Sequence, residues 1–96
     1  EAMLADELDD LFLHYALAMA YATEGNRTEA LERFGQVIER DPDYVAAYFQ
    51  KAQLLAGAGE TDSAREVVTR GIEVAQKTGD AHAAEEMTGF LESLPS

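Results

Sequence analysis

The fold is decided by two consecutive stretches of 34 residues, LFLHYALAMAYATEGNRTEALERFGQVIERDPDY (residues 11–44) and VAAYFQKAQLLAGAGETDSAREVVTRGIEVAQKT (residues 45–78). A shift of 34 residues superposes identical residues at Ala18/Ala52, Ala22/Ala56, Gly25/Gly59, Ala30/Ala64, Glu32/Glu66, Ile38/Ile72 and Glu39/Glu73. A fixed period of this length indicates a repeat architecture, in which neighbouring units stack to bury a continuous core.

The small and aromatic residues within each stretch resemble those of the tetratricopeptide repeat (TPR) family. In the first stretch the matching residues are Leu17-Ala18, Tyr21, Gly25, Ala30, Phe34 and Pro42. In the second they are Tyr48, Ala52, Leu55, Gly59 and Ala64. The second stretch departs from the pattern, since Lys51 replaces the expected leucine, Gln76 the expected proline and Gly71 a second small residue. The resemblance implies an all-α fold of antiparallel helix-turn-helix repeats, stacked as a short right-handed solenoid.

Capping and breaking residues predict where each helix begins and ends. The residues expected to cap helix starts are Asn26 (with Glu29 as a capping box), Thr61 or Asp62, and Asp80. The residues expected to end helices are Asp41-Pro42, Gly57, Gly59 and Gly79. Short polar side chains satisfy the free N–H groups of a first turn, whereas proline and glycine do not continue a helix.

We expect one domain over residues 1–96, because a chain of this length supports a single core. Its predicted parts are repeat 1 (11–44), repeat 2 (45–78) and a capping helix (80–94), which make five helices in all. In the last of these, Ala84, Met87 and Leu91 recur at helical spacing and form an apolar stripe that would cover the second repeat.

The charge and composition exclude several classes of partner. Nineteen acidic residues against seven basic ones give a net charge of −12, which repels phosphate backbones and anionic lipid, so no nucleic-acid or membrane partner is expected. The chain has no cysteine, no apolar run long enough to cross a bilayer and no signal-peptide pattern. The default expectation is therefore a cytoplasmic location, with the acidity either hydrating the surface or attracting a basic partner.

The sequence offers no catalytic constellation, no metal site and no cofactor motif, and we expect a protein that is not an enzyme. His14 occupies a bulky packing position. His82 lies three and four residues before Glu85 and Glu86, a spacing that helix surfaces carry by chance and that lacks the three or four ligands of a metal site. Asp6, Glu7, Asp9 and Asp10 lack the glycine and spacing of a calcium loop. These four acids are expected at the start of the first helix, where the helix dipole stabilises them.

The resemblance places a concave groove on the first helix of each unit and implies that it binds a protein or peptide. The partner-binding residues expected there are Phe12, Tyr15, Met19, Phe49 and Gln53. The lysine and asparagine side chains with which the family grips a C-terminal carboxylate are replaced in this chain, so that mode is not expected. Aromatic and methionine side chains favour an amphipathic helix or an extended apolar segment, with flanking basic residues that match the acidic rim.

The alternative function is structural homo-oligomerisation, in which a homodimer buries the same apolar strip, the five groove residues Phe12, Tyr15, Met19, Phe49 and Gln53. The residues before Leu11 or a further repeat are other candidates for covering that strip. The sequence alone does not choose between a separate partner and self-burial.

Overall fold

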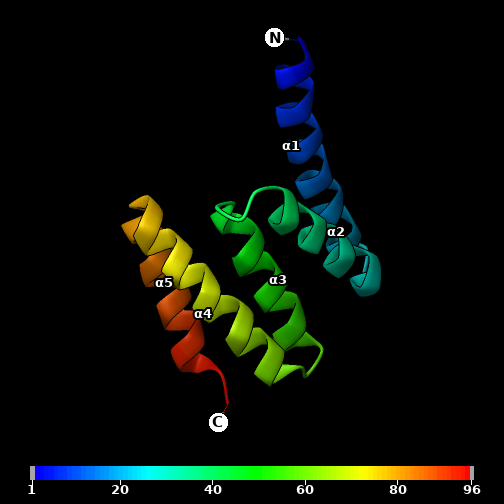
Figure 1. The fold of residues 1–96 in the computed structure, drawn as a ribbon. Coiled ribbons are helices and arrows are strands. Elements are labelled where there is room, and N and C mark those ends of the chain that lie inside the picture. The colour runs from blue at the N-terminus through cyan, green and yellow to red at the C-terminus, as the bar shows by residue number, and fades with distance from the viewer. Residues whose placement is uncertain (1, 96) are drawn as a thin grey trace.

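The computed structural model describes residues 2–95, with side chains from Asp10 onward. The helices are α1 (Ala2–Thr23), α2 (Arg27–Arg40), α3 (Val45–Gly57), α4 (Thr61–Thr78) and α5 (Ala81–Ser93). Residues 2–95 contain no strand, so this part of the chain is all-α. Consecutive helices pair as antiparallel hairpins that stack side by side into a flat solenoid of 47 × 32 × 17 Å (Figure 1).

Asn26 and Asp80 are confirmed as caps, and the predicted cap of α4 is wrong. The capping box of Asn26 with Glu29 is only half formed, because the Asn26 backbone amide donates to the Tyr21 carbonyl and the Glu29 carboxylate bonds to Arg33. The Asn26 carboxamide oxygen accepts a hydrogen bond from the Glu29 amide at 3.4 Å, and the Asp80 carboxylate accepts one from the Ala83 amide at 3.1 Å. The start of α4, in contrast, is capped by neither Thr61 nor Asp62. Glu60 is the N-cap residue of α4, and its side chain makes no capping bond. Asp62 lies inside the first turn, where a carboxylate is stabilised by the helix dipole.

The predicted helix ends are confirmed, and α4 is longer than α2 for a local reason. α2 stops at Arg40, just before Asp41-Pro42, whereas α4 has Gln76 in place of that proline. α4 therefore continues to Thr78 and ends at Gly79, whose φ of 81° lies in the left-handed region that glycine adopts without strain.

The buried residues form two clusters, one for each half of the solenoid. The first cluster contains Ala18, Ala30, Phe34, Val37 and Ala47. The second contains Ala52, Val68, Ala75, Ala84 and Met87. Helix α3 contributes to both clusters, because Ala47 and Ala52 lie on different sides of it. The many alanines allow the paired helices to approach closely.

Helix α4 approaches two neighbouring helices closely at Gly71. A Cβ atom at this position would lie 2.7 Å from Cβ of Tyr48 on α3 and 2.8 Å from Sδ of Met87 on α5. Contacts this short do not occur between real side chains, so α3 and α5 pack against α4 at a distance that only glycine permits. The hydroxyl of Tyr48 donates a 2.7 Å hydrogen bond to the Pro42 carbonyl and thereby joins this crossing to the α2–α3 loop.

The acidic segment before Leu11 does not lie where the sequence led us to expect. Helix α1 starts at Ala2, so residues 6–10 fall beyond its first turn, which contains no acid. The Asp10 carboxylate instead accepts a 2.8 Å hydrogen bond from the Arg40 guanidinium and connects α1 with the end of α2. That hydrogen bond holds the pKa of Asp10 below its ordinary value.

We predict opposite effects of alanine at two helical glycines. Gly71→Ala should lower the free energy of unfolding by about 2 kcal/mol, because overpacking outweighs the gain in helix propensity. Gly89→Ala, in α5, should raise it by about 0.5–1 kcal/mol, since nothing lies within 4 Å of the added Cβ. Urea denaturation of both variants measures the difference, and equal effects would show that the α3–α4–α5 crossing tolerates a methyl group.

The Arg40–Asp10 contact gives a prediction about pH. Because the pKa of Asp10 is lowered in the folded chain, its stabilising contribution is present above the unfolded value of about 3.9 and is lost as the pH falls through the folded value. Arg40→Gln should return the pKa of Asp10 toward that ordinary value in a carboxyl NMR titration. Arg70→Gln removes the same charge at a position without an ion pair to Asp10, and should leave the Asp10 titration unchanged.

Candidate functional site

The five residues expected to bind a partner lie on α1 and α3, but their exposure differs. Phe12 is exposed over 63% of its surface, and Gln53 is also exposed. Tyr15, Met19 and Phe49 are half-buried. Tyr15 and Met19 pack against the first core cluster and Phe49 against the second. The strip is therefore only partly open to solvent, because three of its five members also support the core.

Tyr15 is held in an aromatic group at the junction of α1, α2 and the α2–α3 loop. Its ring lies edge-on to Phe34 with centroids 5.8 Å apart, and 5.2 Å from the ring of Tyr44. Burial raises the pKa of Tyr15, Tyr44 raises it further, and the Gln50 amide beside the phenol acts in the opposite direction. The hydroxyl of Tyr15 lies beside Gln50 of α3, on the groove side.

Phe49 and Gln53 share a hollow between α3 and α5. The hollow has a volume of about 320 Å³ and is lined by Val45, Ala46, Phe49, Gln50, Gln53, Asp80, Ala83, Glu86 and Met87. The ring of Phe49 forms one wall and meets Phe90 of α5 edge-on, with centroids 5.6 Å apart. Asp80 and Glu86 supply carboxylates at the rim, and both are exposed. The site is thus apolar inside and acidic at its edge.

The sequence did not point to the α5 side of this hollow. Asp80 was expected only as a cap and Glu86 only as a neighbour of His82 on a helix surface, and both also line the hollow. Gln50 was not expected either, although it lies between Tyr15 and the residues around Phe49. The glutamine was recognisable as a polar residue within an otherwise apolar segment, residues 45–50, on a helix expected to face the groove.

Each of the two histidines lies close to a carboxylate. His14 is half-buried, with Nδ1 3.4 Å from the Arg33 guanidinium and Nε2 3.7 Å from the Asp10 carboxylate. His82 is exposed and lies 3.5 Å from the Glu86 carboxylate. Within the described residues, no three histidine, aspartate or glutamate side chains come close enough together to hold a metal ion. His14 therefore packs at the α1–α2 interface, as its position in the repeat suggested.

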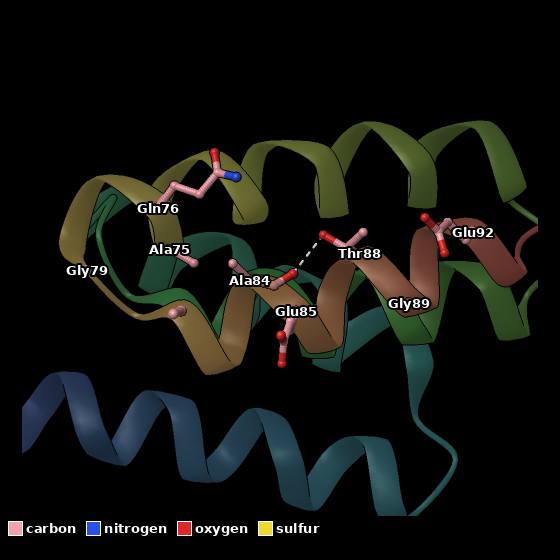
Figure 2. A pocket seen from close by; sticks show the side chains of 9 residues that line it. Ala75, Gln76, Gly79, Ala84, Glu85, Thr88, Gly89 and Glu92 are labelled. Carbon is pink, nitrogen blue, oxygen red and sulfur yellow. Dashed lines mark hydrogen bonds between the residues drawn. The ribbon is translucent and has the colours of Figure 1, made fainter.

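Another hollow lies along the groove between α4 and α5. Its volume is about 620 Å³, and Figure 2 shows that small side chains form much of its lining. The Thr88 hydroxyl is satisfied within α5, since it donates a 2.8 Å hydrogen bond to the Ala84 carbonyl (Figure 2). Glu85 and Glu92 line the same hollow.

A model of the family described as tetratricopeptide repeat matches residues 21–87. The chain belongs to the tetratricopeptide-repeat family. The TPR repeat-containing protein PA0015 of Pseudomonas aeruginosa is 33% identical over 94 residues, which are 98% of this chain and 90% of that protein. The helices α1 to α5 are accordingly those of a TPR solenoid.

Solved structures of similar proteins support the same assignment. A TPR domain protein from Salinibacter ruber superposes with a TM-score of 0.81 at 33% identity, over 84% of this chain and 82% of that one. Protein BPP2914 from Bordetella parapertussis superposes with a TM-score of 0.79 at 32% identity, over 96% and 80% of the two chains. TPR domains are in general non-enzymatic scaffolds that bind proteins or peptides.

Between residues 2 and 95, no helix is both long enough and apolar enough to cross a bilayer.

We predict that the strip separates into residues that support the core and residues that do not. Tyr15→Ala should lower the free energy of unfolding by about 2–3 kcal/mol, somewhat less than for a fully buried aromatic ring. Gln53→Ala should change it by less than about 0.5 kcal/mol, because the side chain is exposed. Thermal denaturation by circular dichroism compares the two, and a Tyr15→Ala variant as stable as the wild type would contradict the aromatic packing described above.

Proposed function

We propose that this TPR domain is a scaffold module that binds a peptide or helix of another protein in the groove of α1, α3 and α5. The binding residues in this proposal are Phe12, Tyr15, Met19, Phe49 and Gln53. The observation that supports it most is the 320 Å³ hollow beside Phe49, because it combines apolar walls with exposed polar groups at one edge. A hollow of this kind fits one or two apolar side chains of a bound segment.

The rim of the hollow indicates which segments would bind. Asp80 and Glu86 lie at its α5 edge, and the chain as a whole has a net charge of −12. Opposite charges across an interface increase the association rate and select partners, whereas the apolar contacts supply most of the affinity. The proposed ligand is thus a segment with an aromatic or branched apolar anchor and flanking lysine or arginine. We propose no catalytic role for the domain. We also propose that it divides into repeat 1 (11–44), repeat 2 (45–78) and a capping helix (80–94).

Self-assembly through the same strip is the competing function. It is less favoured, because two copies of a chain with a net charge of −12 would bring their acidic rims at Asp80 and Glu86 together, and like charges across an interface oppose association. Light scattering over a wide concentration range distinguishes the two, since a homodimer of this kind has a mass that rises with concentration.

Selection from a random peptide library displayed on phage tests the proposal. We expect the enriched peptides to carry an apolar anchor next to basic residues. We expect the double variant Phe49→Ala with Gln53→Ala to lose at least 10-fold in affinity for them, because both side chains line the hollow. Replacing Asp80 and Glu86 by Asn and Gln should weaken binding mainly at low salt, where screening is weak.

Gln36→Ala provides the matched control. Gln36 is an exposed residue of α2 that does not line the hollow, so this variant should bind the selected peptides as the wild type does. Selected peptides whose affinity is unaffected by the Phe49/Gln53 variant would place the interaction elsewhere. A selection that enriches no peptide, together with a concentration-dependent mass, would favour self-assembly.

A further inference from the structure

A second surface of α1 has the properties of an unfilled helix-binding site. Its exposed side chains are Phe12, Leu13, Ala16, Leu17 and Ala20, which we call the α1 outer face. Phe12, Leu13 and Leu17 are 63%, 55% and 44% exposed. The five positions are spaced at i, i+1, i+4, i+5 and i+8, so they form one continuous stripe. The opposite side of α1 carries Ala18, which is fully buried against α2.

Helix α1 is therefore apolar on both sides over residues 11–23, a segment without Asp, Glu, Lys or Arg. A helix that is apolar all round is normally buried. Helix α3 has a similar composition and does lie between other helices, because it packs against α2 on one side and α4 on the other. Helix α1 has α2 on one side, and its outer face has no counterpart among the described residues.

The repeat shows what kind of element fits there. A shift of 34 residues places Leu13, Leu17 and Ala20 on Ala47, Lys51 and Leu54 of α3. Ala47 and Leu54 pack in the first core cluster with Phe34 and Val37 of α2. The Lys51 amine lies 3.8 Å from the position of a Cβ on Gly35, also in α2. By the same register, a helix can pack against the outer face of α1 in the way that α2 packs against α3.

The charges on α1 indicate the chemistry of that helix. Helix α1 has no lysine or arginine, and it carries four acids in residues 6–10, directly before the apolar segment. Figure 1 shows the N-terminal turns of α1 projecting beyond the end of α2. Glu24 follows α1 at its other end and is exposed. Pairing α1 with the α1 of a second copy would place acids near acids, which disfavours a dimer at this face.

We infer that the α1 outer face binds a basic amphipathic α-helix of another protein, with its apolar stripe on Leu13 and Leu17 and its cations beside the exposed Glu24. This surface is separate from the hollow at Phe49. Phe12 at its edge also belongs to the proposed groove, so the inference rests on Leu13 and Leu17 and not on the groove function. The partner helix takes the place next to α1 that α2 takes next to α3. Binding would cover the Leu13 and Leu17 side chains and leave the α3–α5 hollow open.

A synthetic peptide tests this inference. The probe is the sequence of residues 27–40 with Glu29→Lys, Glu32→Lys and Glu39→Lys, which keeps the apolar residues of α2 and makes the peptide basic. We expect the wild-type chain to bind it in a fluorescence anisotropy titration. A peptide of the same composition with its apolar residues in scrambled order should bind at least 10-fold more weakly, because it has no apolar stripe.

The variants identify the surface. Leu13→Ser with Leu17→Ser leaves the net charge unchanged and should weaken binding of the probe at least 10-fold, while circular dichroism should show that the variant remains folded with a modestly lower thermal midpoint. Phe49→Ala with Gln53→Ala should bind the probe as the wild type does. Equal binding of the scrambled peptide, or no effect of the Leu13/Leu17 variant, would overturn the inference. A wild-type dimer that the Leu13/Leu17 variant converts to a monomer would assign the face to a second copy instead.

Discussion

The close contact of Gly71 with Tyr48 and Met87 is the constraint on which the C-terminal half of the fold depends. Without a side chain on Gly71, α4 can lie against α3 and α5 at the same point, and the three helices bury Ala52, Val68 and Met87 between them. Tyr48 extends this arrangement to the preceding loop through its bond to the Pro42 carbonyl. The same arrangement fixes the separation of α3 and α5, and this separation determines the size of the hollow beside Phe49.

Much of the fold was predictable from the sequence because the determinants were local. The 34-residue period sets the number and order of the helices, and the glycine or proline after each helix sets its end. The cap of α4 was not predictable in the same way. Glu60, Thr61 and Asp62 are consecutive polar residues, and which of them is the N-cap depends on the path of the chain after Gly59 rather than on the residue type.

The candidate site was only half predictable, for a physical reason. A repeat register tells which side of a helix a residue occupies, and this was sufficient to place Phe49 and Gln53 on one side of α3. It does not tell how much of that side a later helix covers. The contact of Phe49 with Phe90, and the contribution of Asp80 and Glu86 to the rim, arise from the packing of α5, whose register relative to the repeats is shifted by the longer α4. Tyr15 shows the same effect, because the loop that carries Tyr44 covers part of its ring.

The position of α3 in both core clusters has a consequence for how the domain opens. The N-terminal hairpin and the C-terminal three helices each have their own buried residues, and α3 is the helix that belongs to both sets. In a linear array, in which each element contacts its neighbours, the ends separate before the centre. Fraying would therefore begin at α1 and at α5, and the amides around Ala47 to Ala52 would exchange their hydrogens with solvent last. The most protected part of this domain would thus be a single helix at its midpoint, while the surfaces offered to partners lie toward the parts that open first.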